Sequence, residues 1–181
     1  DDKILLTNSK LGMLTALATC SSLYLSPLLV GMGLHINRDN YISLTENFYK
    51  ATVFMFVSES DKENVEYGDI VSITSNDLFI NNSGVFCKLT SNRRTFRLIP
   101  PTNNLLGKVI HYGDPVYIDN MSYILGNNFD TTYYIGKTDR PAAFYMQPAY
   151  APLMSLGSQI YNSKYTNNDK TFLRILSYNI W

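Results

Sequence analysis

The stretch that decides the fold is Val65-Glu66-Tyr67-Gly68-Asp69-Ile70-Val71-Ser72-Ile73, because a close copy follows it. The copy is Ile110-His111-Tyr112-Gly113-Asp114-Pro115-Val116-Tyr117-Ile118, and the two Tyr-Gly-Asp cores lie 45 positions apart. Glycine allows a tight turn or bulge at each core. Asp69 and Asp114 can accept hydrogen bonds from the turn backbone. A repeat of about 45 residues therefore organises the chain.

Each copy continues through the same succession of strand-like segments. A short apolar segment, a polar turn, a second apolar segment and an aromatic segment ending in Pro follow the motif. They are residues 78–80, 85–89 and 95–100 in one copy, and 123–125, 132–135 and 143–148 in the next. A weaker upstream copy is indicated by residues 20–25, 33–36, 41–44 and 51–57. Three copies of four strands predict an all-β fold, the β-trefoil, in which barrel strands are capped by hairpins.

Strand alternation predicts which side chains enter the core. Val71 and Ile73 should point inward, and Ser72 between them should point outward. One Phe recurs near the end of each copy, at Phe54, Phe96 and Phe144. We expect these three side chains to be buried at equivalent places.

The Val-x-Tyr-Gly-Asp-x-Val-x-Ile pattern resembles the MIR-type β-trefoils of protein mannosyltransferases and intracellular calcium-release channels. The resemblance covers two copies and implies a fold more than an activity. Ricin-type lectins carry Gln-x-Trp in each repeat, whereas Trp181 is the only Trp of this chain. That counts against the ricin class.

The end of the chain carries a second resemblance. Leu173-Arg174-Ile175-Leu176-Ser177-Tyr178-Asn179-Ile180-Trp181 resembles the opening strand of the endonuclease/exonuclease/phosphatase superfamily, which includes DNase I-like nucleases. The resemblance implies that Asn179 lies near a catalytic Mg²⁺ in a longer parent protein. We expect a trefoil over 1–152, a linker over 153–170, and the start of a truncated second domain over 171–181. The alternative is a peripheral trefoil strand.

Charge argues against two classes of partner. The chain has 15 Lys and Arg and 15 Asp and Glu, so no global field attracts nucleic acid or an anionic membrane. Residues 11–36 hold no charged residue, but Pro27, Gly31 and Gly33 divide them into short pieces. Buried strands therefore fit that segment better than a membrane span, which needs about 20 consecutive apolar residues.

Catalytic and metal-binding motifs are not found in the sequence. His35, His111, Cys20 and Cys87 do not have the spacing of a metal site, and we expect them to be structural. The two cysteines could pair, or could stay as buried free thiols. We expect the chain itself to be inactive and to need no cofactor.

Two kinds of residue remain as candidates for binding. Arg94 and Arg97 could bind phosphate on a lipid head group, or could simply be solvated at a hairpin tip. Exposed tyrosines suit a protein or glycan surface; they include Tyr133, Tyr134, Tyr145 and Tyr150. The chain is therefore predicted to be the non-catalytic targeting domain of a metal-dependent phosphodiesterase (nuclease, phosphatase or sphingomyelinase-like). The alternative is a free-standing β-trefoil lectin or inhibitor that binds glycan or protein.

Overall fold

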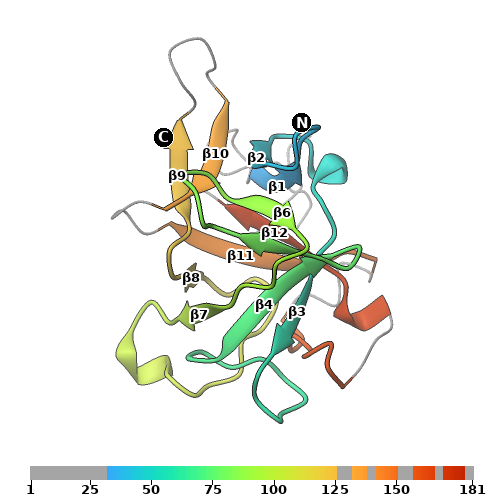
Figure 1. Cartoon of the computed structure of the whole chain (residues 1–181). Coiled ribbons are helices and arrows are strands. Elements are labelled where there is room, and N and C mark those ends of the chain that lie inside the picture. Colours follow the sequence, from blue (N-terminus) through green and yellow to red (C-terminus); the bar gives the residue numbers. More distant parts are fainter. Residues whose placement is uncertain (1–31, 126–131, 138–141, 151–156, 166–168, 178–181) are drawn as a thin grey trace, which may run out of the picture. The chain divides into compact units, whose positions relative to one another are not determined.

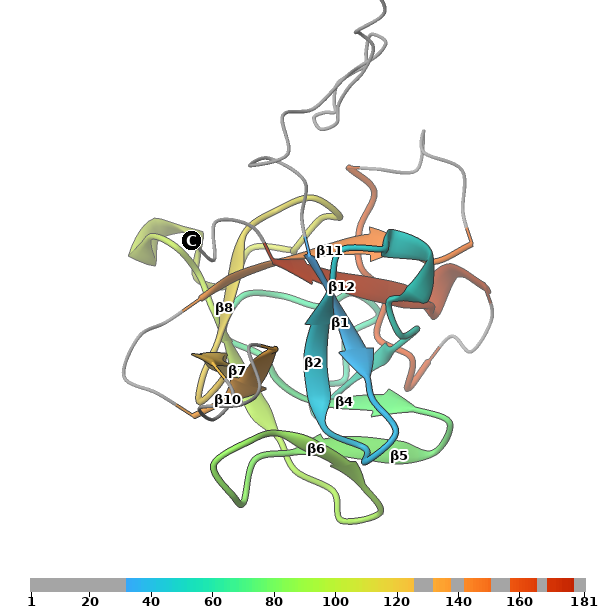
Figure 2. The same ribbon diagram turned by 90° about the horizontal axis from the view of Figure 1, so that it is seen from above.

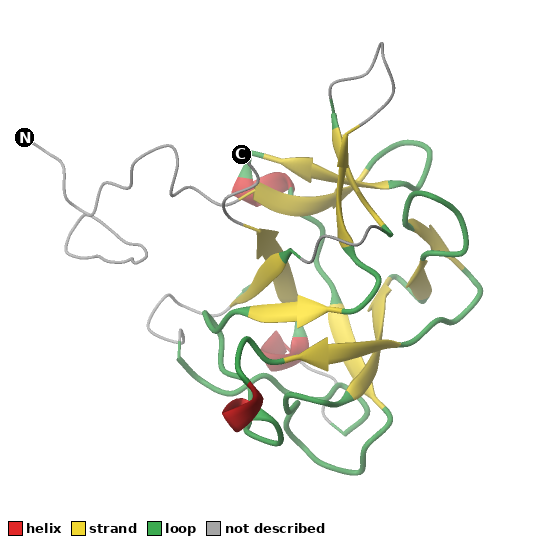
Figure 3. Cartoon of the chain, turned by 90° about the vertical axis from the view of Figure 1, so that its left-hand side faces the viewer, coloured by secondary structure: helices red, strands yellow, loops and turns green. Residues whose placement is uncertain are grey.

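The computed structural model describes residues 32–125, 132–137, 142–150, 157–165 and 169–177, and this part of the chain is all-β (Figure 1). Its strands are Met32–Ile36 (β1), Ile42–Thr45 (β2), Met55–Ser58 (β3), Ile70–Ser75 (β4), Leu78–Asn81 (β5), Lys88–Thr90 (β6), Phe96–Ile99 (β7), Val116–Ile118 (β8), Ser122–Leu125 (β9), Tyr133–Gly136 (β10), Ala143–Pro148 (β11) and Leu173–Ser177 (β12). The helical elements described are short 3₁₀ turns at Phe48–Lys50 (η2), Asn103–Leu105 (η3) and Asp169–Thr171 (η5), as Figure 3 shows. The all-β prediction is confirmed.

All strand pairs are antiparallel and belong to one strongly curled sheet (Figure 2). Eleven strands follow the order β6-β5-β4-β7-β8-β11-β12-β1-β2-β10-β9, and β3 pairs with β4. The pairs of consecutive strands include β1–β2, β5–β6 and β9–β10, which are called the three hairpins below. The strands predicted from residue 33 onward are therefore present. Residues 20–25 lie outside the described part.

One predicted strand is shorter than expected. Residues 85–89 were expected to form one strand, but β6 begins at Lys88. Phe86 makes only an isolated bridge to Gly136. Before Lys88 the backbone is therefore not paired with β5. At Phe86 it pairs instead with Gly136 of the β9–β10 hairpin.

The two Tyr-Gly-Asp turns have the expected local chemistry. Gly68 and Gly113 have φ angles of 97° and 93°, a region that favours glycine. The Asp69 carboxylate accepts from the backbone N–H of Glu66 at 2.9 Å. Asp114 accepts from the N–H of His111 at the same distance. The predicted role of both aspartates is confirmed.

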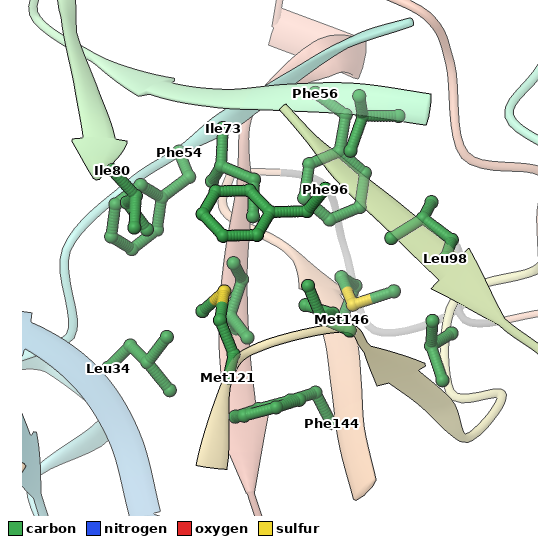
Figure 4. Packing of buried hydrophobic residues seen from close by; sticks show 14 of the residues in the cluster. Leu34, Phe54, Phe56, Ile73, Ile80, Phe96, Leu98, Met121, Phe144 and Met146 are labelled. Atoms are coloured by element: carbon green, nitrogen blue, oxygen red, sulfur yellow. The ribbon is translucent and has the colours of Figure 1, made fainter. Parts of the chain in front are cut away.

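The core cluster contains side chains from strands all along the described chain, and Figure 4 shows part of it. Phe54, Phe96 and Phe144 are at most 1% exposed, so their predicted burial is confirmed. Val71 and Ile73 are fully buried as expected, but Ser72, expected to point outward, is fully buried too. The Ser72 hydroxyl lies 3.5 Å from the Val57 carbonyl oxygen on β3, which satisfies the buried polar group.

A ring of three backbone hydrogen bonds joins distant parts of the chain. Val65 N–H donates to Ile160 C=O at 2.9 Å, Ile110 N–H donates to Val65 C=O at 2.9 Å, and Ile160 N–H donates to Ile110 C=O at 3.0 Å. All three side chains are fully buried. Ile160 comes from the segment 153–170, for which a linker was expected.

The C-terminal strand β12 lies inside the sheet. It pairs with β11 over five residues and with β1 over two. Leu173, Ile175 and Ser177 are fully buried. Arg174 donates to the carbonyl oxygens of Ala149 at 3.0 Å and Ala51 at 3.3 Å. The backbone groups of this strand therefore have partners on both sides.

Candidate functional site

The three hairpins bring three aromatic side chains together. These are Tyr41, Phe86 and Tyr134, called here the cap cluster. The ring centroids of Tyr41 and Phe86 are 6.0 Å apart, those of Tyr41 and Tyr134 are 6.3 Å apart, and those of Phe86 and Tyr134 are 4.8 Å apart. The two contacts of Tyr41 are edge-to-face, an arrangement that the ring quadrupoles favour. Each hairpin contributes one ring, so the cluster exists only when all three hairpins meet.

Backbone bridges between the hairpins hold the cap cluster in place. Tyr41 bridges Lys88, Phe86 bridges Gly136, and Tyr134 pairs with Ser43. Each cluster residue therefore pairs with a residue of the next hairpin. The rings are then positioned by main chain rather than by side-chain contacts alone.

The residues that follow the cluster in sequence lie beneath it. Ile42, Cys87 and Ile135 are fully buried, whereas the cluster residues themselves are half-buried. This follows from strand alternation, because successive side chains point to opposite faces. Burial raises the pKa of the Cys87 thiol to about 12. The thiol therefore stays protonated at neutral pH, the form that is unreactive as a nucleophile.

A cavity of about 260 Å³ opens beside two of the rings. It is lined by Tyr41, Asn81, Ser83, Gly84, Val85, Phe86, Lys88 and Thr90. Val85 is 67% exposed, so the apolar wall formed with Phe86 is open to solvent. The cap cluster together with this cavity is called the cap site below.

The rim of the cavity is stiffened by its own hydrogen bonds. The Asn81 amide donates to Asn92 C=O at 3.1 Å and accepts from Ser83 N–H at 2.9 Å. The Thr90 hydroxyl contacts both the N–H and the C=O of Asn92. Asn81 and Thr90 therefore shape the cavity, and their side chains are already occupied.

Three polar groups at the cavity remain available. The hydroxyls of Tyr41 and Ser83 make no hydrogen bond within the described residues. The Lys88 ammonium lies 5.0 Å from the Tyr41 ring centroid and forms no ion pair with a described carboxylate. A cation over a ring face is attracted by the ring quadrupole. The Tyr41 ring thus holds the Lys88 ammonium at the cavity. No described carboxylate neutralises that charge.

A second cavity, of about 390 Å³, lies along β3 and β4. Its lining residues are Thr52, Val53, Met55, Thr74, Ser75, Asn76, Tyr150 and Phe172. The rings of Tyr150 and Phe172 meet edge-to-face at 5.7 Å. No charged side chain is among these residues, so the cavity offers shape and hydroxyls but no charge.

Neither cavity uses the arginines singled out from the sequence. The Arg97 guanidinium donates to Gly68 C=O at 3.0 Å. The backbone N–H of Arg97 donates to the Asp119 carboxylate at 2.6 Å. Its guanidinium therefore supports the Gly68 turn. Arg94 is exposed. Asn179 lies outside the described residues, as does Cys20.

The two histidines have structural neighbours. His35 Nδ1 lies 2.8 Å from Lys50 C=O, and His111 Nδ1 lies 3.5 Å from the Asp114 carboxylate. In the described ranges, His, Cys, Asp and Glu do not gather in groups of three that could hold a metal ion.

Sequence reasoning named Tyr134 only as one of several tyrosines and missed Tyr41 and Phe86. A signal was present, because each of the three rings directly precedes a buried hairpin residue. Aligning the hairpins of the three copies around Ile42, Cys87 and Ile135 would have placed the rings together.

No protein-family model, curated protein or solved structure matches this chain. Among the residues that the structure describes, none belongs to a helix long and apolar enough to cross a membrane.

Proposed function

We propose that residues 32–177 form a β-trefoil recognition domain that binds a glycan or protein partner through the cap site and carries out no chemistry itself. The observation that carries the function is the convergence of three half-buried rings beside a cavity with an unneutralised lysine. Aromatic rings with polar tips are well suited to contact surfaces. A positioned charge adds specificity to such a surface.

Repeated core contacts support the trefoil. Phe54, Phe96 and Phe144 face Leu173, Val71 and Val116, respectively, across the strands, and Phe56, Leu98 and Met146 face Ile73, Ile118 and Ile175. None of these twelve residues is more than 3% exposed. The hydrogen-bonded ring of Val65, Ile110 and Ile160 adds a further set of three. Three equivalent units explain all these sets at once.

This assignment builds one unit from both ends of the chain. β12 takes the place that β4 and β8 hold in the other units, and β1, β2 and β3 complete its copy. The turn of this unit is at Ser163, whose N–H donates to Phe56 C=O, as the N–H groups of Gly68 and Gly113 donate to the carbonyl oxygens of Leu98 and Met146. Gly157 N–H donates to Tyr112 C=O, as Gly107 N–H donates to Tyr67 C=O. The trefoil proposed here therefore extends through residue 177.

Binding on an array of glycans and peptides tests the function. The full chain should retain a set of ligands, and Phe86→Ala or Tyr41→Ala should reduce retention at least tenfold. Tyr49→Ala and Tyr150→Ala serve as matched controls, because these rings are 84% and 61% exposed and neither lines the cavity of the cap site. Equal loss in the controls, or unchanged binding by Phe86→Ala, would refute the cap site as the binding face.

A second candidate function rests on the sequence of residues 173–181. Their likeness to the opening strand of the endonuclease/exonuclease/phosphatase superfamily favours a longer parent protein, with Mg²⁺ near Asn179. In that case the trefoil would position a phosphodiesterase on the partner of the cap site. The gene sequence that follows Trp181 tests this directly: an open frame with paired acidic residues and histidines supports it, and a stop codon rules it out.

A further inference from the structure

We infer that the ligand of the cap site is a hexuronic acid, a single pyranose ring that carries one carboxylate. The inference rests on the proposed function, because it names the ligand of the same site. Three properties of the cavity carry it: its size, its apolar wall and its unpaired cation.

The size of the cavity limits the part of a ligand that it can enclose to one small ring. Pockets that enclose drug-sized molecules measure roughly 300–1,000 Å³, and this cavity measures about 260 Å³. A single six-carbon sugar is small enough for that space. A sugar acid with long side arms, or a folded peptide segment, is too large to be enclosed by it.

The wall of the cavity suits the face of a sugar ring. Phe86 and Val85 present apolar surface, and Val85 is largely exposed. A pyranose has an apolar face of C–H groups, and packing it on an aromatic ring removes both surfaces from water. The hydroxyls of Tyr41 and Ser83 can then bond the ring hydroxyls, because neither has a partner in the described structure.

Charge selects the acid over the neutral sugar. The Lys88 ammonium sits over the Tyr41 ring, without a described carboxylate partner. A charge-assisted hydrogen bond between ammonium and carboxylate is roughly twice as strong as a neutral one. Because Tyr41 already holds the ammonium over the cavity, less side-chain freedom is lost when the carboxylate arrives.

Titration calorimetry on the full chain with two sugars tests the inference. Methyl glucuronide and methyl glucoside differ only in the carboxylate at C6. We expect the glucuronide to bind at least tenfold more tightly. Lys88→Gln should remove that preference and leave the glucoside affinity unchanged. Lys137→Gln is the matched control: Lys137 is exposed and its N–H donates to Val85 C=O, but its side chain does not line the cavity.

The outcomes separate this inference from the proposed function. Equal affinity for the two sugars, or a glucuronide affinity that survives Lys88→Gln, overturns the inference alone, provided that Phe86→Ala still removes array binding. If neither sugar binds while array binding depends on Phe86, the ligand is of another class and the inference is again wrong. If Phe86→Ala leaves array binding unchanged, both proposals fail. Because Lys88 is exposed, a thermal melt should show that Lys88→Gln is folded.

Discussion

Phe54 and Leu173 exchange two backbone hydrogen bonds although they are far apart in the sequence. Phe54 N–H donates to Leu173 C=O at 2.7 Å, and Leu173 N–H donates to Phe54 C=O at 2.9 Å. Both side chains are fully buried. The pair joins the residue directly before β3 to the first residue of β12.

The packing of β12 predicts that truncating the Ile175 side chain strongly lowers the free energy of unfolding. Its side chain is fully buried and lies opposite Met146. Ile175→Ala should lower the free energy of unfolding by about 2–5 kcal/mol through lost contacts and a cavity. Urea denaturation measures this, and Lys164→Ala on the exposed surface should change it by no more than about 0.5 kcal/mol. A cost below about 1 kcal/mol for Ile175→Ala would show that β12 does not pack as described.

The proposed equivalence of three units predicts that truncating any of their three Phe residues lowers the free energy of unfolding by a similar amount. Phe54→Ala, Phe96→Ala and Phe144→Ala should each destabilise the protein by roughly 3–5 kcal/mol, because each ring is buried in the same core. Tyr49→Ala, at an 84% exposed ring, is the control and should be nearly neutral. One Phe that costs less than about 1 kcal/mol would break the proposed symmetry.

The hydrogen bonds of the Asn162 side chain predict that removing it clearly lowers the stability of the fold. It is fully buried and accepts from the N–H groups of Ser58 and Lys164. It also donates to the carbonyl oxygens of Ser60 and Lys62. Asn162→Ala leaves the buried N–H of Ser58 without this partner, and an unsatisfied buried group costs about 1–3 kcal/mol. The exposed Asn104→Ala is the control. Equal urea midpoints for both variants would contradict this account.

The raised pKa values of the buried Cys87 thiol and Tyr112 hydroxyl predict that the protein loses stability at alkaline pH. Burial raises the pKa of Cys87 and of Tyr112 to about 12, above the values of about 8.5 and 10 expected for these groups in an unfolded chain. The unfolded state therefore loses these protons first, so their contribution is complete below about pH 8.5 and is lost as pH rises toward 12.

Tyr112→Phe provides the test of that pH dependence. The variant lacks one titrating group, so its urea midpoint should fall less between pH 9 and about 11.5 than that of the unaltered protein. Tyr49→Phe, at an exposed ring, should leave the slope unchanged. Identical slopes for Tyr112→Phe and the unaltered protein would contradict the assignment.

Local signals in the sequence account for much of this fold. The Tyr-Gly-Asp turns were predictable because glycine and aspartate act within a few residues of their own positions. The strands from residue 33 onward followed from alternation and β-branched composition. Ser72 was mispredicted because alternation tells which face a side chain takes but not whether another strand covers it.

Tertiary features were harder to predict. The turn of the proposed unit that contains β12 is Asn162-Ser163-Lys164, which lacks the Tyr-Gly-Asp sequence, so the motif does not reveal this copy. The cap cluster arises only when three hairpins meet, and no short window contains two of its rings. A lysine over a tyrosine ring, such as Lys88 over Tyr41, is likewise a product of the fold.

The role of β12 as an integral strand is the central claim, and deleting residues 171–181 tests it most directly. The deletion removes the partner of β1, β11 and Phe54 and exposes the core that Leu173 and Ile175 cover. A thermal melt of the deleted chain should therefore lose the single cooperative transition of the full chain. A cooperative transition with an unchanged midpoint would contradict the account, because it would show that residues 32–170 fold without this strand.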